Sequence, residues 1–587
     1  MYLVLLFAGI LFYENAFASD WSTYGNGLKN HRYSSLQQVN KSTVKSLGLA
    51  WKYDTGIKAS FQTSPIKLGD MLFLSTPLNH VVALNAETGD LVWRYQHPSP
   101  KQKSCCGPAN RGVAVAQGKV LQATVDGYLI ALDQFSGELI WRRKVEDLNL
   151  SIQESVEGLL QGMEINDSAI VTGGTSHSFN MAPQVFGNKV IIGSTGAGYG
   201  LHLDTDKGLR VVGIGDGRTG LRGFLAAFDI ETGKELWRWY SVDGEHWVGE
   251  WKESTPDGIS YNRDIEKEKA DQERFRHSWK LGGGSIWTTP AVDQESGWLF
   301  VGTGNPAPNM DDSTRPGDNL HTSSLVAIDS QTGELMWSFQ QVPHDRWGYD
   351  VSSPPVLFDT VVNGVKVKAV GQAGKTGWFY VLNRETGELI FTSDAFVPQK
   401  NLFADPAEGG VTIAPGIAGG SNWSPVSVNP ETSHVFISGI HRPATYYRKQ
   451  LKGDNSLPWQ TYTYFEFEDI KPEFKGEKPY GTLTSIDLAN GKLQWQHKTR
   501  TPMIGGSLAT AGGLVFSGEG DGEFFALDTE TGNKLWSYQQ SYGVNAPPIT
   551  YSVNGKQYIA VAAGGNSIAG YPVGDSLLVF SLPEADK

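Results

Sequence analysis

The sequence predicts an all-β fold, an eight-bladed β-propeller whose ring is closed by pairing of the N- and C-terminal strands. Three observations support this expectation. One eleven-residue pattern occurs seven times along the 587 residues, an eighth copy is split between the two ends of the chain, and six of the seven copies end on a tryptophan. A hairpin about every 40 to 50 residues, with occasional longer insertions, is typical of propeller blades.

Each copy of the pattern has the form strand, tight turn, strand. It begins with Ala-Leu-Asp or a close variant, continues to a Thr-Gly or similar pair, and ends on an aromatic residue. The Asp or Asn side chain can bond to its own backbone at the turn, the glycine supplies a positive φ, and the aromatic residue anchors the next strand. The seven copies occupy residues 83–93, 131–141, 227–237, 327–337, 381–391, 485–495 and 526–536.

The eighth copy would join the two ends of the chain. Residues 577–583 match the first half of the pattern and residues 49–53 match the second half. Pairing of these two segments, which we call the clasp, would close the ring and leave no exposed edge strand. We therefore expect one domain over residues 19–587 rather than two smaller sheet domains side by side. The segments too long for hairpin loops, which we expect on one face around a site, are 145–180, 199–222, 241–282 and 395–420.

Residues 1–18 have the features of a signal peptide. An apolar run from Leu3 to Tyr13 is followed by the small-residue pattern Ala16-Phe-Ala18 ahead of Ser19. No Lys or Arg precedes the run, so a misassigned start is the alternative interpretation. No other stretch approaches the roughly 20 apolar residues that span a bilayer. We expect a soluble, periplasmic mature protein with no transmembrane segment.

Composition excludes several classes of function. Hydrophobic residues make up 40% and charged residues 19% of a chain with a net charge of -13, so the chain should fold and nucleic acid is not an expected partner. The only cysteines, Cys105 and Cys106, are adjacent, which excludes a disulfide scaffold, a thiolate zinc finger and a C-x-x-C-H haem attachment. A G-x-G-x-x-G pattern at residues 215–220 precedes a strand instead of a helix, so no nicotinamide cofactor is expected.

The tryptophan repeat and the segment Cys105-Cys106-Gly-Pro-Ala-Asn-Arg111 together resemble the pyrroloquinoline quinone (PQQ) dependent alcohol dehydrogenases, such as methanol dehydrogenase, over nearly the whole mature chain. In that family, adjacent cysteines form a disulfide ring that stacks on one face of the quinone, and a tryptophan stacks on the other. The resemblance implies these roles for Cys105, Cys106 and Trp287. Two planar walls suit a flat conjugated cofactor. Two free thiols on a loop are the alternative.

The resemblance also implies which residues hold and activate the quinone. Its three carboxylates need cations, hydroxyl groups and amides. Lys375 would lie near the reactive carbonyl oxygens, where we expect a catalytic role. The other cofactor-binding residues implied are Arg111, Asn180, Thr195, Gly196, Ala197, Asn422 and Trp423.

Two carboxylates typical of the family are missing from their expected positions. The family holds a calcium or lanthanide ion with Glu, Asn and often an added Asp, and a hard cation of this kind prefers several oxygen ligands. Asn305 matches the Asn ligand, but Gly198 stands at the Glu position, and alignment past the following insertion puts Arg218 there instead. Gly348 replaces the catalytic Asp, and Asp350 falls where lanthanide enzymes carry their added Asp.

Three interpretations of these departures remain. Asp350 serves as the base beside a weakened metal site, or Asp350 and an insertion carboxylate such as Asp216 rebuild the ligand set, or the site binds quinone without turnover. We therefore predict Asp350 and Lys375 as catalytic residues, and Asn305 and Asp350 as metal ligands.

The leading hypothesis is a PQQ-dependent dehydrogenase that oxidises an alcohol to an aldehyde or ketone, with a soluble cytochrome c or a membrane quinone as electron acceptor. A non-catalytic or quinone-binding propeller scaffold is one alternative. A sugar or polyol dehydrogenase is another, because residues 350–355 resemble a stretch of membrane-bound glucose dehydrogenases.

Overall fold

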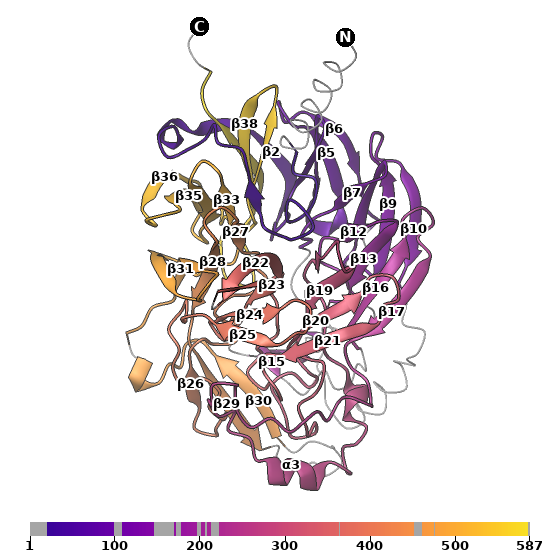
Figure 1. Cartoon of the computed structure of the whole chain (residues 1–587), viewed down its shortest axis with the longest axis vertical. Coiled ribbons are helices and arrows are strands. Elements are labelled where there is room, and N and C mark those ends of the chain that lie inside the picture. The colour runs from indigo at the N-terminus through magenta and orange to yellow at the C-terminus, as the bar shows by residue number, and fades with distance from the viewer. Residues whose placement is uncertain are drawn as a thin grey trace.

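Eight sheets arranged as propeller blades make up most of the described chain. The computed structural model describes residues 20–98, 109–145, 170–171, 178–195, 201–205, 208–212, 222–362, 364–450, 461–474 and 476–584. In this part of the chain, each blade has four antiparallel strands that follow one another in sequence, apart from short insertions and the split last blade. Figure 1 shows the blades as successive colours from indigo to yellow.

The first four blades run from residue 66 to residue 340. Their strands are β3 (Ile66–Leu68), β4 (Met71–Ser75), β5 (Val81–Asn85) and β6 (Leu91–Tyr95); β7 (Ala114–Ala116), β8 (Lys119–Ala123), β9 (Tyr128–Asp133) and β10 (Leu139–Lys144); β12 (Gln184–Phe186), β13 (Lys189–Gly193), β16 (Phe224–Asp229) and β17 (Glu235–Tyr240); and β18 (Ala291–Val292), β19 (Trp298–Gly302), β20 (Ser324–Asp329) and β21 (Leu335–Gln340).

The other four blades complete the ring. Their strands are β22 (Val356–Val362), β23 (Val365–Ala373), β24 (Phe379–Asn383) and β25 (Leu389–Thr392); β27 (Ser427–Asn429), β28 (His434–His441), β31 (Tyr480–Asp487) and β32 (Leu493–Thr499); β33 (Leu508–Thr510), β34 (Leu514–Gly518), β35 (Glu523–Asp528) and β36 (Lys534–Gln539); and β37 (Ile549–Val553), β38 (Lys556–Ala563), β39 (Gly574–Ser581) and β2 (Gly48–Ala59).

The predicted clasp is confirmed by the eighth blade. The N-terminal strand β2 pairs antiparallel with the C-terminal strand β39, with Tyr53 opposite Leu577. Blade seven then contacts blade eight, because the Trp536 indole N–H donates to the Leu47 carbonyl at 3.0 Å. Blade eight contacts blade one, because the Trp51 ring lies over Gly89. The ring is therefore closed by side chains as well as by strands.

The docking tryptophans join each blade to the next by one repeated contact. The Trp93 indole N–H donates to the Gln134 carbonyl of blade two at 3.0 Å, and its ring lies over Gly137. A Cβ at Gly137 would lie 2.5 Å from that ring, and the residue has φ of +72°. Two features therefore exclude a side chain at this glycine of the repeat: its positive φ and the tryptophan ring that lies over it. Blade five carries Phe391 in this position, against Gly491.

Short elements outside the blades come from the insertions. They are the sheet β11 (Ile170–Val171), β14 (Leu201–Thr205) and β15 (Gly208–Val212); the sheet β26 (Val411–Ile413), β29 (Ala444–Gln450) and β30 (Thr461–Glu466); the helix α3 (Ile265–Asp271); and the 3-10 turns Val44–Ser46, Pro77–Asn79, Ser278–Leu281 and Pro472–Phe474. Figure 1 places β26, β29, β30 and α3 together at the lower end of the view. Among the described residues, no helix is both long and apolar enough to cross a membrane.

An extended segment near the N-terminus runs along the first strands of four blades. We call residues 28–34 the N-terminal strap; it ends in β1 (Tyr33–Ser34), which pairs parallel with β33. Its carbonyls at Leu28, Lys29, His31 and Arg32 accept the N–H groups of Val292, Leu357, Val428 and Ala509, which belong to β18, β22, β27 and β33. The strap therefore ties blades four to seven together on the axial side of their sheets.

Candidate active site

Arg111, Asn180 and Thr195 come together at the axial ends of blades two and three. Arg111 lies just before β7, Asn180 just before β12, and Thr195 just after β13. One Arg111 Nη donates to the Asn180 side-chain oxygen at 2.7 Å, and the Thr195 hydroxyl donates to the same oxygen at 2.9 Å. All three side chains are buried. Residues far apart in sequence thus form one cationic, hydroxyl- and amide-bearing wall.

Two tryptophans flank the Arg111 guanidinium. Its central carbon lies 4.9 Å from the ring centroid of Trp287 and 4.9 Å from that of Trp423. One Arg111 Nη also donates to the Trp287 carbonyl at 3.3 Å. The preceding residue, Asn422, accepts the Trp423 N–H and donates to the Ala418 carbonyl, which fixes the turn that presents Trp423. Both predicted tryptophans therefore belong to the same site as Arg111.

Asp350 lies between Trp287 and Lys375. The Trp287 indole N–H donates to one Asp350 oxygen at 3.0 Å, and the other oxygen forms an ion pair with the Lys375 ammonium. Lys375 also donates to the Gly348 carbonyl at 2.8 Å. Asp350 is 3% exposed and Lys375 is 8% exposed. The two predicted catalytic residues are thus in contact, and the Trp287 indole orients the carboxylate.

Asp345, which the sequence analysis did not single out, organises the loop that carries Asp350. One of its oxygens accepts the N–H groups of Trp347 and Gly348, and the other accepts the Tyr349 N–H at 2.9 Å and the Asn305 amide at 2.6 Å. Asp345 is fully buried. A signal for it does exist in the sequence: an Asp three residues before a glycine has the spacing of a side chain that bonds to its own turn.

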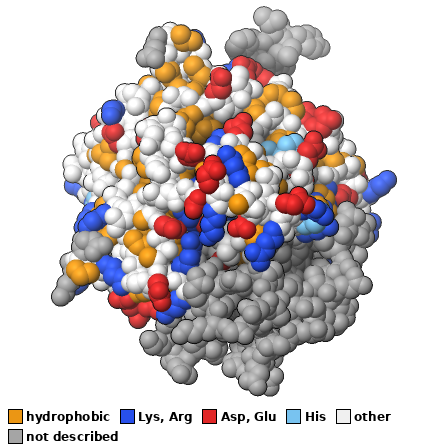
Figure 2. Space-filling view, turned by 90° about the horizontal axis from the view of Figure 1, so that it is seen from below, with side chains coloured by type: hydrophobic (Ala, Val, Ile, Leu, Met, Phe, Trp, Pro, Cys, Tyr) orange, Lys and Arg blue, Asp and Glu red, His pale blue; other side chains and the backbone are white. Residues whose placement is uncertain are grey.

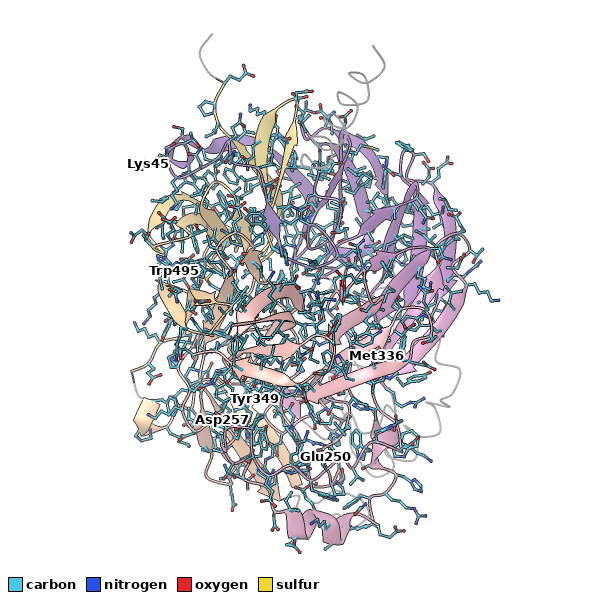
Figure 3. All side chains as sticks on the ribbon, in the orientation of Figure 1. Lys45, Glu250, Asp257, Met336, Tyr349 and Trp495 are labelled. Carbon is cyan, nitrogen blue, oxygen red and sulfur yellow. The ribbon has the colours of Figure 1, made fainter. Side chains whose placement is uncertain are left out.

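The backbone at Gly348 explains why this position lacks a carboxylate. Gly348 has φ of +81°, and a Cβ there would lie 2.8 Å from Cγ1 of Ile417. A side chain would therefore meet both an unfavourable backbone conformation and a close neighbour. Figure 3 labels the adjacent Tyr349 on the side of β24 that faces β26, β29 and β30. Asp350, two residues later in the same loop, carries the carboxylate that contacts Lys375.

Two of the four insertions expected around the site, 241–282 and 395–420, lie wholly in the described part of the chain. In segment 241–282, Asp264 caps α3, and Arg263 binds Asp318 at 2.5 Å and Glu268 at 2.7 Å. Arg346 and Arg448 bind Asp312 nearby at 2.9 and 2.8 Å.

The electrostatics of Asp312 follow from these contacts. Burial alone would raise the pKa of this carboxyl, but Arg448, His344 and Arg346 outweigh burial and hold the pKa well below its ordinary value. The loop before Asp350 is thus held by buried ion pairs.

Several predicted residues lie outside the described part of the chain. They are Cys105, Cys106, Gly196, Ala197, Gly198, Asp216 and Arg218, together with the signal peptide at residues 1–18. The vicinal disulfide and the roles of Gly196 and Ala197 therefore stay predictions.

Comparison with known proteins decides the family. The sequence model of the family described as "PQQ: Glucose/ethanol/alcohol dehydrogenase, beta-propeller domain" matches residues 21–402 and 395–559. The chain belongs to the PQQ-dependent alcohol dehydrogenases. This dehydrogenase is 32% identical to the quinohemoprotein alcohol dehydrogenase of Comamonas testosteroni over 94% of its own chain and 73% of the relative. It is 30% identical to the quinoprotein ethanol dehydrogenase of Pseudomonas aeruginosa over 96% of its own chain and 90% of the relative.

Solved structures agree with this assignment. The crystal structure of the Comamonas testosteroni enzyme matches 97% of this dehydrogenase and 82% of that chain with a TM-score of 0.76 at 30% identity. A europium-containing methanol dehydrogenase matches 96% of this dehydrogenase and 98% of that chain with a TM-score of 0.74 at 26% identity. The fold and the enzyme class are thereby established, and the enzyme is an oxidoreductase.

The described residues fit the quinone of the family. Arg111 offers a cation, Thr195 a hydroxyl and Asn180 an amide, the donor set that carboxylates need. Trp287 and Trp423 offer aromatic surface beside this donor set. Lys375 and Asp350 add an acid–base pair. A planar, anionic, conjugated group matches all three properties of the site.

The described residues do not by themselves complete a site for a metal ion. Asn305 and Asp350 contribute oxygens, but both Asp350 oxygens are engaged, by Trp287 and by Lys375. In the described part of the chain, no group of three His, Cys, Asp or Glu residues is placed to hold a metal. A calcium or lanthanide ion needs six or more oxygens, so no catalytic step is derived through one.

Proposed function

We propose that this dehydrogenase oxidises a primary or secondary alcohol to an aldehyde or ketone and passes the electrons to a separate acceptor. The observation that carries the proposal is the Asp350 carboxylate, buried and held between Trp287 and Lys375. A base of this kind, beside residues that bind the cofactor of the family, is what removal of a hydroxyl proton requires.

In the proposed mechanism, Asp350 accepts the hydroxyl proton of the alcohol. The Lys375 ammonium forms an ion pair with this carboxylate and holds it in place. The Trp287 indole N–H fixes the orientation of the carboxylate. PQQ, when bound, supplies the oxidant that takes up the two electrons and the hydrogen leaving the alcohol carbon. Arg111, Asn180 and Thr195 bind and orient the cofactor, and Trp423 limits the access of water.

Asp350 takes over the role that the family gives to a residue at position 348. The left-handed backbone of Gly348 turns its carbonyl toward the Lys375 ammonium at 2.8 Å, so Lys375 is held by two groups of the same loop. With the base at position 350, the carboxylate forms an ion pair with Lys375. The loss of the carboxylate at position 348 therefore does not by itself remove general-base chemistry.

The cellular setting is part of the proposal. The apolar run and small-residue pattern of residues 1–18 support export to the periplasm. The 587 residues hold no C-x-x-C-H motif, and the acceptor we propose is a soluble cytochrome c or a membrane quinone. N-terminal sequencing of protein purified from the periplasm of a Gram-negative host tests export, and an N-terminus other than Ser19 would contradict the expected cleavage site.

Reconstitution tests the activity. Protein incubated with PQQ and either calcium or a lanthanide is assayed with a dye acceptor on alcohols, polyols and glucose. We expect Asp350→Asn to lower kcat by about 10²- to 10⁴-fold, the usual contribution of a general base, with PQQ binding retained. Asp329→Asn, at the turn of an outer hairpin, is the matched control and should leave kcat unchanged.

The outcomes separate the competing functions. Activity on glucose or polyols but not on simple alcohols would favour the sugar or polyol dehydrogenase. Bound PQQ without turnover on any substrate, with either metal, would refute the proposed activity and favour a quinone-binding scaffold. Equal kcat for wild type and Asp350→Asn would refute the role of Asp350 alone.

A further inference from the structure

Arg32, in the N-terminal strap, is a buried cation with only uncharged partners. Its side chain is fully buried. Its guanidinium donates to the carbonyls of Ser507 at 3.2 Å and Pro548 at 2.7 Å, to the Tyr24 carbonyl, and to the Ser64 hydroxyl at 3.3 Å. No described Asp or Glu forms an ion pair with it. Burial lowers the pKa of Arg32 to about 10, so the group stays charged at neutral pH.

A buried charge without a counter-charge is unfavourable and calls for a compensating group. Hydrogen bonds to carbonyls satisfy the donors of a guanidinium but do not neutralise its charge. The rings of Trp21 and Tyr24, at 5.2 and 5.3 Å, add attraction from their π faces, and they too are uncharged. An anionic ligand close to Arg32 would supply the negative charge that the described protein groups around it lack.

Arg32 lies directly behind the wall that carries Arg111. Ser64 joins the two residues, because its hydroxyl accepts both Arg32 Nη groups and its N–H donates to the Arg111 carbonyl at 2.9 Å. The electrostatics of Tyr24 agree with this placement. Burial raises the pKa of the Tyr24 phenol, while Arg32 and Arg111 both act to lower it. Ser64 thus links the Arg32 guanidinium to the backbone of Arg111, and both cations act on the Tyr24 phenol.

The strap that carries Arg32 also contacts the segments that bear the other site residues. The Asn30 amide donates to the carbonyls of Thr289 and Pro355, both at 3.2 Å. Thr289 is two residues after Trp287, and Pro355 is five residues after Asp350. The strap thus contacts the segments that carry Trp287 and Asp350.

We propose that Arg32 is a further residue of the cofactor site, whose buried charge acts with that of Arg111 to bind the carboxylates of PQQ through space. The inference rests on the proposed binding of PQQ. Arg32 makes no direct contact in this role. The contribution of Arg32 to binding is electrostatic, so it depends on the charge of the ligand. A purely structural contribution would be the same for a charged and an uncharged ligand.

The test compares PQQ with its trimethyl ester, which keeps the conjugated rings and lacks the three negative charges. Affinities of both are measured by quenching of tryptophan fluorescence. At an effective dielectric constant of about 20, one charge about 10 Å away changes affinity for an anion on the order of tenfold. We expect Arg32→Gln to weaken PQQ binding by about that factor with little effect on the ester. Arg32→Lys, which keeps the charge, should bind PQQ within about threefold of wild type.

Arg384→Gln is the matched control for removing a buried arginine. Arg384 is 3% exposed and lies between blades four and five, where it binds Asp359 at 3.1 Å. We expect this variant to change the affinities for PQQ and the ester equally or not at all. A loss of preference for PQQ in Arg384→Gln as large as in Arg32→Gln would overturn the inference.

The remaining outcomes are distinct. Wild-type protein that binds neither compound contradicts the proposed function and the role of Arg32 together. Wild-type protein that prefers PQQ, with the same preference in Arg32→Gln, overturns the role of Arg32 only. Where Arg32→Gln does not fold, hydrogen–deuterium exchange of the wild type decides. PQQ should then slow exchange in residues 25–34 more than the ester does, and equal slowing by both ligands refutes the inference.

Discussion

Asp345→Asn tests whether one buried carboxylate supports the active-site loop. Asp345 accepts the N–H groups of Trp347 and Gly348 on one oxygen, and the Tyr349 N–H, the Asn305 amide and a hydroxyl on the other. An asparagine replaces one oxygen by an NH₂ group, so in either orientation at least two buried donors lose their acceptor.

The magnitude follows from that count. Each buried donor left unpaired costs about 1–3 kcal/mol, and more where the lost partner is charged, so two donors cost about 4 kcal/mol in the free energy of unfolding. Asp329→Asn is the control. Asp329 accepts the N–H groups of Gln331 and Thr332 on one oxygen at an exposed turn, and the repeat already carries asparagine at the equivalent Asn85. We expect a cost below about 1 kcal/mol for the control.

Urea unfolding followed by tryptophan fluorescence and far-ultraviolet circular dichroism measures both variants. Coincident transitions from the two probes are needed before free energies are compared. Asp345→Asn should also weaken PQQ binding and lower kcat, because Asn305, Gly348 and Asp350 all depend on this loop. An unfolding free energy for Asp345→Asn no lower than that of Asp329→Asn would refute the reasoning.

Three further predictions concern the backbone, pH and blade docking. Gly348→Ala should be less stable than Gly364→Ala by about 1 kcal/mol or more. Both glycines have φ near +80°, but only at Gly348 would a Cβ lie 2.8 Å from a neighbouring atom, Cγ1 of Ile417. Equal stabilities of the two variants in thermal unfolding would contradict this prediction. Burial lowers the pKa of His321 to about 4. Between pH 6.5 and 4 the unfolded state therefore binds a proton that the folded state does not, and stability falls as the pH is lowered. His321→Gln should reduce this loss of stability by up to about 3 kcal/mol, and an unchanged pH profile of stability would count against the prediction. Trp141→Phe removes an indole hydrogen bond of 3.2 Å to a carbonyl of the next blade and should cost about 1 kcal/mol, and no change in the urea midpoint would argue against the docking role.

Local turn chemistry is why most of the fold could be predicted from the sequence. The turn of the repeat depends on residues within a few positions of one another, such as Asp133 and Gly137, and the structure shows the expected bonds there. The clasp could be predicted as well, because each half of the split motif retains its own pattern. Arg111, Asn180, Thr195, Trp287 and Trp423 were identified through a family resemblance, and the structure brings them together.

The parts that could not be predicted depend on contacts between distant segments. The N-terminal strap bonds to four strands spread over more than 200 residues, and no periodicity in its sequence marks those partners. The ion pair of Asp350 with Lys375 was not foreseen, although both residues were proposed as catalytic. Asp345 was missed because a single acidic residue at a turn has no repeat to identify it.

Charged side chains of both signs are mixed on the surface. Figure 2 shows Lys and Arg side chains lying among Asp and Glu side chains across the described part of one face.

The clasp has a consequence for the order in which the enzyme assembles. Strand β2 begins at Gly48, and its partner β39 begins at Gly574, so blade eight forms only after more than 500 residues of intervening chain have been made. The strap likewise waits for β33 in blade seven. Contacts between residues so far apart in sequence form slowly, because closing the long loop between them lowers the conformational entropy before the contacts stabilise the chain. The ring therefore closes only after nearly the whole chain has been made, and β2 stays without its partner strand until then.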